Sequence, residues 1–404
     1  MNTLFLLCAA ITGISLIIYG LQVIAVRRTT VRSRCGTVPA PVLSALPPIS
    51  VLKPLKGLDD NLFDNLESFC RQDYPDYEVI FALQDHNDPA YKVARKIRDK
   101  HPEKNIAIIV ERCNAGLNPK VNNLIPAYRA SRHDTVLISD SNVLVGPDYL
   151  RSIAARLNDP AVGLVTNLIR GTGGVTLGAV LENLHLNSFI IGSVCFLDRY
   201  LRMPCVIGKS MLMRKKDLES IGGFAAFKDV LAEDYLIGRN MQEQGKIFAV
   251  SAYRVNNVNQ YWSIGRFLNR HTRWGKLRWK IGGYQYVSEL LANPVFLACM
   301  TLLLAGPSRQ AVLLAVVTAG LKVLGDHAMG ESIGASQPFR SLLLIPIKDV
   351  IVGLLWFVPL LSDTVMWRGN RYLLDKDSRL APAPEHGVWS WRYRFTEAVK
   401  AWSA

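Results

Sequence analysis

The chain has 404 residues, half of them are hydrophobic, and its formal net charge is +14 at pH 7. This length allows two or three domains, and the mean hydropathy of +0.15 indicates a protein with both membrane-embedded and globular parts. The positive charge fits a nucleotide or an anionic lipid surface, and the long apolar segments favour a membrane partner over nucleic acid. Seven scattered cysteines without a CxxC pair exclude a zinc site and a disulfide framework, and they favour a reducing compartment.

The first element is an apolar run from Leu4 to Val26, which is long enough to cross a bilayer as a helix. Arg27, Arg28, Arg32 and Arg34 follow it directly. By the positive-inside rule, the rest of the chain is expected in the cytoplasm. A cleaved signal peptide is the alternative, but in a signal peptide the basic residues precede the apolar run.

A proline-containing linker at residues 28–48 leads into a region that alternates strand-like and helix-like patterns. The predicted strands are 49–55, 77–84, 106–110 and 135–139, and the predicted helices are 61–70, 90–101 and 121–130. This alternation predicts an α/β domain with a mostly parallel sheet and ligands at the carboxyl ends of its strands. Asp85 and Asp140 both stand at such ends.

Asp140 is the first candidate ligand of a divalent cation, Mg²⁺ or Mn²⁺, because it follows a buried strand and Asn142 offers a second oxygen two residues later. The alternative is that Asp140 caps the helix expected near Pro147. For Asp85, contact with the base or ribose of a nucleotide competes with an Asx turn at the start of the next helix.

The segment around Glu233 and Asp234 joins two adjacent carboxylates to a basic helix downstream. Arg266, Arg270 and Arg273 are spaced i, i+4 and i+7, so a helix places all three on one face, where they can hold a diphosphate. We therefore expect Asp234 to take a proton from a hydroxyl nucleophile, with Glu233 as the competing base. The pairing of base and diphosphate site describes a transferase that uses a nucleotide sugar.

Three other motifs carry weaker signals. The run Gly208–Ser210 resembles part of a phosphate loop, but the earlier glycine of that loop would fall on Met203. His185 and His271 each stand alone in the sequence and are not expected to be catalytic. The pair Asp59-Asp60 is expected at a helix N-terminus.

Apolar patterns return after residue 284, in the runs 294–306, 311–325 and 341–362. The first two are short for full spans and predict a pair of tilted helices or re-entrant segments. The third carries Lys348 and Asp349, which should face protein or a polar groove. Trp274, Trp279 and Tyr284 alternate with basic residues, as in a helix at the level of the lipid headgroups.

Several of these motifs together resemble the ceramide glucosyltransferases and their bacterial relatives, glycosyltransferase family 21 of the GT-A fold. The matching runs are 51–57, 74–79, 84–89, 118–124, 232–235 and 270–274. The family signature, three aspartates followed by an R/QxxRW box, falls on Asp85, Asp140, Asp234 and Arg270–Trp274. The resemblance implies UDP-sugar and metal binding by the first two aspartates, a base at the third, and diphosphate contact from Arg270, Arg273 and Trp274. The middle motif, Asp140-Ser-Asn, departs from a strict DxD pattern.

A narrower similarity lies in the runs 184–190 and 193–198, which resemble a bacterial subgroup that decorates bacteriohopanetetrol with N-acetylglucosamine. The expected reaction is an inverting transfer from UDP-glucose or UDP-N-acetylglucosamine to the hydroxyl of ceramide or bacteriohopanetetrol. It would take place at the cytoplasmic face of a bacterial inner membrane or its equivalent. A processive polysaccharide synthase and a non-enzymatic membrane adaptor that binds anionic lipid are the alternatives.

The sequence thus predicts a GT-A nucleotide-sugar-binding domain between an N-terminal transmembrane helix and C-terminal membrane-embedded helices. The expected divisions are a membrane anchor at 1–27, a linker at 28–48, a cytosolic catalytic domain at 49–265, a basic interfacial helix at 266–286, membrane helices at 287–365 and a cytosolic or peripheral tail at 366–404.

Overall fold

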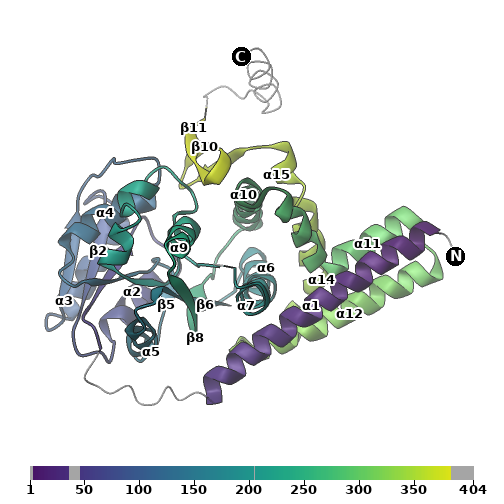
Figure 1. The fold of residues 1–404 in the computed structure, drawn as a ribbon, viewed down its shortest axis with the longest axis horizontal. Helices are drawn as coiled ribbons and strands as arrows, with labels where there is room; N and C mark the ends of the chain where they lie inside the picture. The colour runs from purple at the N-terminus through teal and green to yellow at the C-terminus, as the bar shows by residue number, and fades with distance from the viewer. Residues whose placement is uncertain (1–2, 36–45, 204, 384–404) are drawn as a thin grey trace, which may run out of the picture.

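The structure is a computed structural model that describes residues 3–35, 46–203 and 205–383. An α/β domain lies at one end of the molecule and a bundle of long apolar helices at the other, with a small second sheet beside the α/β domain (Figure 1). Residues 36–45 of the predicted linker and 384–404 of the predicted tail lie outside the described part.

The main sheet has eight strands in the order β3-β2-β1-β4-β7-β6-β8-β5. Its strands are β1 (Ile49–Pro54), β2 (Tyr77–Leu83), β3 (Ile106–Val110), β4 (Thr135–Ile138), β5 (Val143–Leu144), β6 (Val162–Thr172), β7 (Met211–Arg214) and β8 (Ile247–Val258). The four strands predicted from the sequence pair in parallel. In the other half, β7 is antiparallel to β4 and β6, and β5 is antiparallel to β8, so the complete sheet is mixed.

Helices cover both faces of this sheet because successive strand residues point to opposite sides. On β2, Val79 and Phe81 belong to one buried cluster, and Ile80 and Ala82 belong to another. The first cluster includes side chains of α2 (Leu62–Cys70), α3 (Pro89–Lys100) and α5 (Tyr149–Ala154), and the second includes those of α4 (Pro119–Ala130), α8 (Lys215–Glu219) and α9 (Glu233–Glu243).

The start of α4 matters for the site. The Asn118 side chain accepts hydrogen bonds from the backbone N–H groups of Lys120 and Val121, and Pro119 occupies the first helical position. Both features favour a helix start at this point. They place Lys120 in the first turn of α4.

A helical segment from Leu177 to Leu201, made of α6 (Leu177–His185), η3 (Leu186–Ile190), α7 (Ile191–Phe196) and η4 (Leu197–Leu201), lies between the sheet and the apolar bundle (Figure 1). It is long and apolar enough to cross a membrane, but two thirds of its most apolar window is buried inside the protein. It therefore packs as an internal layer of the protein. The sequence patterns do not predict this layer.

The bundle contains α1 (Thr3–Cys35), α11 (Pro294–Ala305), α12 (Arg309–Ile333) and α14 (Ile345–Leu355), and α1 runs beside α11 and α12 (Figure 1). Within the described residues, four helical segments are long and apolar enough to span a membrane. A fifth is possible if α10 (Ile264–Gly282) with η6 (Gly283–Ala292) forms one span with α11 across a bend of 82°. The helix α12 is longer than the predicted run 311–325.

After α15 (Val358–Leu361) the chain returns to the α/β domain as a three-stranded sheet of β9 (Thr364–Trp367), β10 (Asn370–Leu374) and β11 (Leu380–Pro382). Leu231 packs in a buried cluster with Val365 and Leu374, and Val230 forms a β-bridge with Arg379. The predicted boundary between residues 365 and 366 falls inside β9.

Candidate active site

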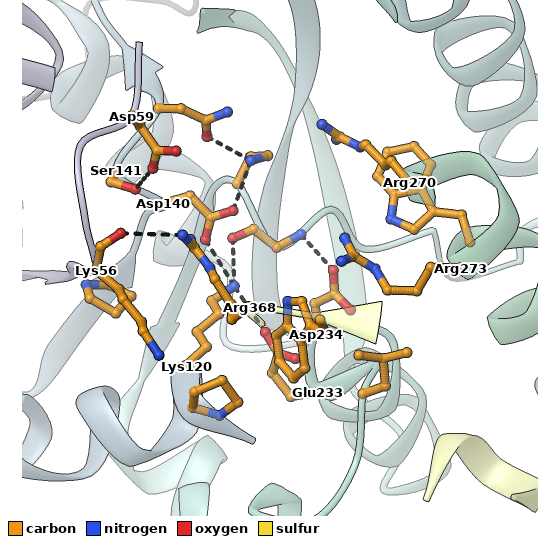
Figure 2. A pocket seen from close by; sticks show the side chains of 18 of the residues that line it. Lys56, Asp59, Lys120, Asp140, Ser141, Glu233, Asp234, Arg270, Arg273 and Arg368 are labelled. Atoms are coloured by element: carbon orange, nitrogen blue, oxygen red, sulfur yellow. Dashed lines mark hydrogen bonds and ion pairs between the residues drawn. The ribbon is translucent and has the colours of Figure 1, made fainter. Parts of the chain in front are cut away.

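A cleft of about 500 Å³ opens at the carboxyl ends of β1 and β4, between the α/β domain, α10 and the turn that joins β9 to β10. Eleven charged side chains line it. Four are acidic and seven are basic: Asp59, Asp140, Glu233 and Asp234, with Lys56, Lys120, Lys209, Arg266, Arg270, Arg273 and Arg368. Figure 2 shows Arg270 and Arg273 on one side, Asp59 and Ser141 on the other, and Asp140 and Asp234 between them.

Asp140 follows β4 and is surrounded by lysines. Its Oδ1 lies 3.0 Å from Lys120 Nζ, and its Oδ2 lies 2.9 Å from Lys209 Nζ. The buried Lys53 donates a hydrogen bond to the Asp140 backbone carbonyl at 2.6 Å. Burial alone would raise the pKa of Asp140, but the ammonium groups of Lys120 and Lys209 outweigh it and hold this pKa well below its usual value. Asp140 is therefore a permanent anion.

The two predicted candidate bases occupy the first turn of α9 but have different partners. Asp234 Oδ2 accepts a hydrogen bond from the Gly208 N–H, and Oδ1 accepts one from the Tyr235 N–H, both at 2.8 Å. Burial, followed by the adjacent Glu233 charge, raises the pKa of Asp234 to about 6. Glu233 is buried and its Oε1 forms an ion pair with Lys120 Nζ at 2.9 Å.

The helix α10 begins at the Ser263 cap, whose hydroxyl accepts the Arg266 N–H at 3.1 Å. Arg266, Arg270 and Arg273 all line the cleft from this helix, as the i, i+4, i+7 spacing predicts. The Arg270 guanidinium lies 4.2 Å from the ring centroid of Trp274. The aromatic ring therefore fixes the plane in which Arg270 can donate hydrogen bonds.

Behind the cleft, the buried Glu182 of α6 joins two residues of α10. Its Oε1 lies 3.2 Å from Arg270 Nη1, and its Oε2 lies 2.9 Å from His271 Nε2. The His185 and His271 rings are 4.4 Å apart. The two histidines, isolated in the sequence, belong to one buried cluster that supports Arg270, and neither lines the cleft.

Asp85 lies apart from the other predicted site residues. Its side chain is exposed, it is not among the residues that line the cleft, and its Oδ1 accepts the Asn87 N–H at 2.8 Å in an Asx turn. Asp88 caps α3. The nucleotide contact of Asp85 stays a prediction. The cleft does bring together Asp140, Asn142, Glu233, Asp234, Arg270, Arg273 and Trp274.

The model of one protein family, glycosyl transferase family 21, matches residues 7–380 of this chain. The chain belongs to glycosyltransferase family 21. The matching relatives include ceramide glucosyltransferases 1 and 3 of Caenorhabditis elegans. The first is 29% identical over 363 residues, covering 83% of this chain and 73% of the relative, and the second is 26% identical over 348 residues, covering 84% and 75%.

Solved structures also match this family 21 glycosyltransferase. A mannosyltransferase from Pyrobaculum calidifontis in complex with GDP-Man and Mn²⁺ matches with a TM-score of 0.49 and 17% identity, covering 87% of this chain and 99% of that one. With the family match, the mixed sheet and apolar helices both before and after it in the chain, the predicted fold class is confirmed.

The donor set at Asp140 does not fit a divalent cation as it stands. Both Asp140 oxygens contact ammonium groups, and Asn142 Oδ1 accepts a hydrogen bond from Lys209 Nζ at 2.6 Å. Among the described residues, no group of three or more His, Cys, Asp or Glu side chains is placed to hold a metal. A metal could reach the oxygens of Asp140 and Asn142 only if Lys209 moved away.

Several residues of the cleft in this family 21 enzyme were missed from the sequence. Asp59 was expected at a helix N-terminus, but it lines the cleft, accepts a hydrogen bond from Ser141 and lies 3.6 Å from Arg266. The sequence motifs do not single out Lys120 or Lys209 either. A usable signal existed: Lys120 follows Pro119, which favours a helix start, and Lys209 follows Gly208, which permits close approach to the backbone.

Proposed function

We propose that this chain is a membrane-bound inverting glycosyltransferase. It moves a sugar from UDP-glucose or UDP-N-acetylglucosamine to the hydroxyl of a lipid acceptor, ceramide or bacteriohopanetetrol. One observation carries the proposal: a single cleft holds the candidate base Asp234 together with Arg266, Arg270 and Arg273. This arrangement allows proton removal from the acceptor and charge stabilisation on the leaving diphosphate at the same site.

The proposed base is Asp234. Glu233 Oε1 is paired with the Lys120 ammonium, and its Oε2 accepts a hydrogen bond from Asn118 Nδ2 at 3.1 Å, so both of its oxygens have side-chain partners. The hydrogen bonds described for the Asp234 carboxylate come only from backbone N–H groups, those of Gly208 and Tyr235. Its raised pKa brings its basicity closer to neutral pH while leaving it ionised there.

The proposed diphosphate site is the face of α10 formed by Arg266, Arg270 and Arg273. In a direct displacement, the acceptor oxygen attacks the anomeric carbon as the bond to UDP breaks, and negative charge grows on the diphosphate. Guanidinium groups held in fixed positions stabilise this charge more in the transition state than in the ground state. The pairing of Arg270 with Glu182 and Trp274 supplies this fixation.

A lipid acceptor is supported by the relation of the cleft to the apolar helices. The helix α10 runs from the cleft to η6, where Tyr284 is 90% exposed, and η6 is followed directly by the apolar α11. The names of the C. elegans relatives favour ceramide and glucose, and the runs 184–190 and 193–198 favour bacteriohopanetetrol and N-acetylglucosamine. We further propose that the cleft faces the cytoplasm, where UDP-sugars are supplied and where Arg27 and Arg28 are expected.

The test uses the full chain in lipid nanodiscs with each UDP-sugar and each lipid acceptor, and mass spectrometry identifies the product. Asp234→Asn should lower turnover about 10²- to 10⁴-fold, because the proton acceptor is removed. Asp99→Asn on the exposed side of α3 is the matched control and should leave turnover unchanged. Undiminished turnover by Asp234→Asn would remove this residue as the base.

The same assay separates the alternatives. A processive polysaccharide synthase would give a polymer whose length grows with time, and an adaptor that binds anionic lipid would give no sugar transfer. The proposed reaction includes no step on the predicted divalent cation, Mg²⁺ or Mn²⁺, because the oxygens proposed to bind it are in contact with lysines.

A further inference from the structure

The contacts of Lys209 raise a question that the proposed function leaves open, namely which cation faces the donor diphosphate. Lys209 Nζ bridges the two residues that the sequence assigns to a metal. It lies 2.9 Å from Asp140 Oδ2 and 2.6 Å from Asn142 Oδ1. The Lys209 side chain is 14% exposed, so the ammonium is enclosed but still reaches the cleft.

The charges of this pair suit a monovalent cation. The DxD pattern would supply two carboxylates for a divalent ion, whereas Asp140 and Asn142 supply one carboxylate and one neutral amide. A single ammonium balances a single carboxylate. Lys120 Nζ holds the other Asp140 oxygen at 3.0 Å and is itself shared with Glu233.

The backbone around Lys209 is held on both sides. The side chain that carries the ammonium therefore starts from a fixed position. The Gly208 N–H donates to Asp234 at 2.8 Å. The buried Ser210 hydroxyl donates to Asn167 Oδ1 at 2.6 Å and contacts the Tyr149 hydroxyl at 2.6 Å. Fixed donors of this kind need no reorganisation when charge develops.

The charge of the whole cleft agrees with this assignment. Seven basic and four acidic side chains line it, a formal net charge of +3. The buried Glu182 behind Arg270 reduces this to +2. A nucleotide diphosphate sugar carries one negative charge on each phosphate, so the side chains of this cleft neutralise it without a further cation.

We propose that the Lys209 ammonium, bridging Asp140 and Asn142, occupies the place of a divalent cation at the donor diphosphate. Nucleotide binding by this chain is then independent of added divalent metal. This inference rests on the proposed function, because it assumes that the cleft takes a UDP-sugar.

The test titrates UDP by calorimetry into the full chain in nanodiscs, once with EDTA and once with Mn²⁺. The wild type should bind UDP equally in both conditions. Lys209→Met should bind UDP about 10- to 100-fold more weakly in EDTA, the loss expected for one charge-assisted contact, and should recover affinity with Mn²⁺ because the oxygens of Asp140 and Asn142 are freed. Electron paramagnetic resonance should detect bound Mn²⁺ with UDP in the variant and none in the wild type.

Lys56→Met is the matched control, because it removes an exposed lysine of the same cleft that has no described contact with Asp140. Its UDP affinity should not respond to EDTA. A wild type that binds Mn²⁺ with UDP and loses more than about tenfold in affinity on chelation overturns the inference. The wild-type comparison decides this even if Lys209→Met does not fold. Loss of sugar transfer to lipid with UDP binding retained would count against the proposed function alone.

Discussion

Glu233 and Asp234 are adjacent in the chain, but their carboxylates have different environments because Lys120 forms an ion pair with Glu233. The Lys120 ammonium lies 2.9 Å from Glu233 Oε1, whereas burial and the adjacent Glu233 charge raise the pKa of Asp234. A carboxylate next to a like charge in a poorly solvated place is a better base than one in water. The sequence left the choice between Glu233 and Asp234 open, and the position of Lys120 favours Asp234.

The pKa of about 6 at Asp234 predicts the pH dependence of turnover. A base must be ionised to accept a proton, so kcat/KM should rise tenfold per pH unit below about pH 6 and level off above it. A pH series from acidic to neutral buffer, with thermal unfolding recorded in each, checks this. A plateau that continues well below pH 5 would mean that another group is the base.

Gly208 has no room for a side chain beside the Asp234 carboxylate. A Cβ added there would lie 2.7 Å from Asp234 Oδ2 and 3.1 Å from Lys120 Nζ. Gly208→Ala should therefore displace the Asp234 carboxylate and lower kcat more than it weakens UDP binding. Gly320→Ala in α12, where a Cβ meets nothing within 4 Å, is the control. Equal kcat for Gly208→Ala and the wild type would contradict the placement of Asp234.

Among the elements of the fold, the helix α10 places Arg266, Arg270 and Arg273 on one face, and this face lines the cleft. The Ser263 cap fixes the first turn of α10, and the Trp262 and Trp274 rings orient Arg266 and Arg270 before any ligand binds. A preoriented guanidinium loses little freedom on binding a diphosphate. The affinity for UDP should therefore depend on this face more than on other charges of the same helix.

Arg273→Ala tests this dependence. UDP binding should weaken about 10- to 100-fold with the fold retained, because one charge-assisted contact is lost. Arg278→Ala is the control on the same helix, since Arg278 lies outside the cleft and pairs with Glu289 at 2.8 Å. Circular dichroism checks that both variants keep the fold, and UDP titration measures their affinities. An equal loss in the two variants would indicate a general electrostatic effect.

Sequence patterns predicted the elements that have strong local periodicity. The strands β1 to β4 and the helices α2 to α4 fall within a few residues of the predicted ranges, because apolar periods of 2 and 3.6 record burial directly. The prediction that Lys348 and Asp349 face protein is confirmed, since both are buried in ion pairs with each other and with α12.

The rest depends on long-range contacts that no local pattern records. The strand β7 joins the sheet antiparallel between β4 and β6, and the Leu177–Leu201 segment is apolar because protein surrounds it. Likewise, Lys209 meets Asp140 because β7 pairs with β4, and Lys120 reaches the same carboxylate from α4. A lysine in a sequence carries no sign of the carboxylate it will meet.

At the scale of the molecule, a buried ion network joins the apolar bundle to the internal layer. Lys322 and Asp326 of α12 form an ion pair at 2.6 Å, and Lys348 of α14 lies 3.6 Å from Asp326. The Tyr19 hydroxyl of α1 donates to Asp326 Oδ1 at 2.8 Å, and Lys348 donates to the Ser188 hydroxyl at 3.0 Å. These contacts connect α1, α12 and α14 of the bundle to the Leu177–Leu201 segment.

Removal of one member of this network should destabilise the whole protein. Asp326→Asn leaves two buried lysines with one carboxylate, and loss of one partner of a buried pair costs about 3–5 kcal/mol. Thermal unfolding in detergent should shift to lower temperature, with UDP-sugar turnover reduced only through loss of folded protein. Glu331→Gln, exposed on the same helix, should unfold like the wild type. An unshifted transition for Asp326→Asn would show that the network contributes little.

The small sheet β9–β11 places Trp367 and Arg368, which come after the last apolar helix, at the rim of the cleft. On a ribosome, the α/β domain emerges long before these residues are made. The cleft therefore stays incomplete during synthesis and acquires its last wall only after the membrane helices have been translated. Competence to use an energy-rich sugar donor is in this way postponed until the C-terminal apolar helices have joined the α/β domain.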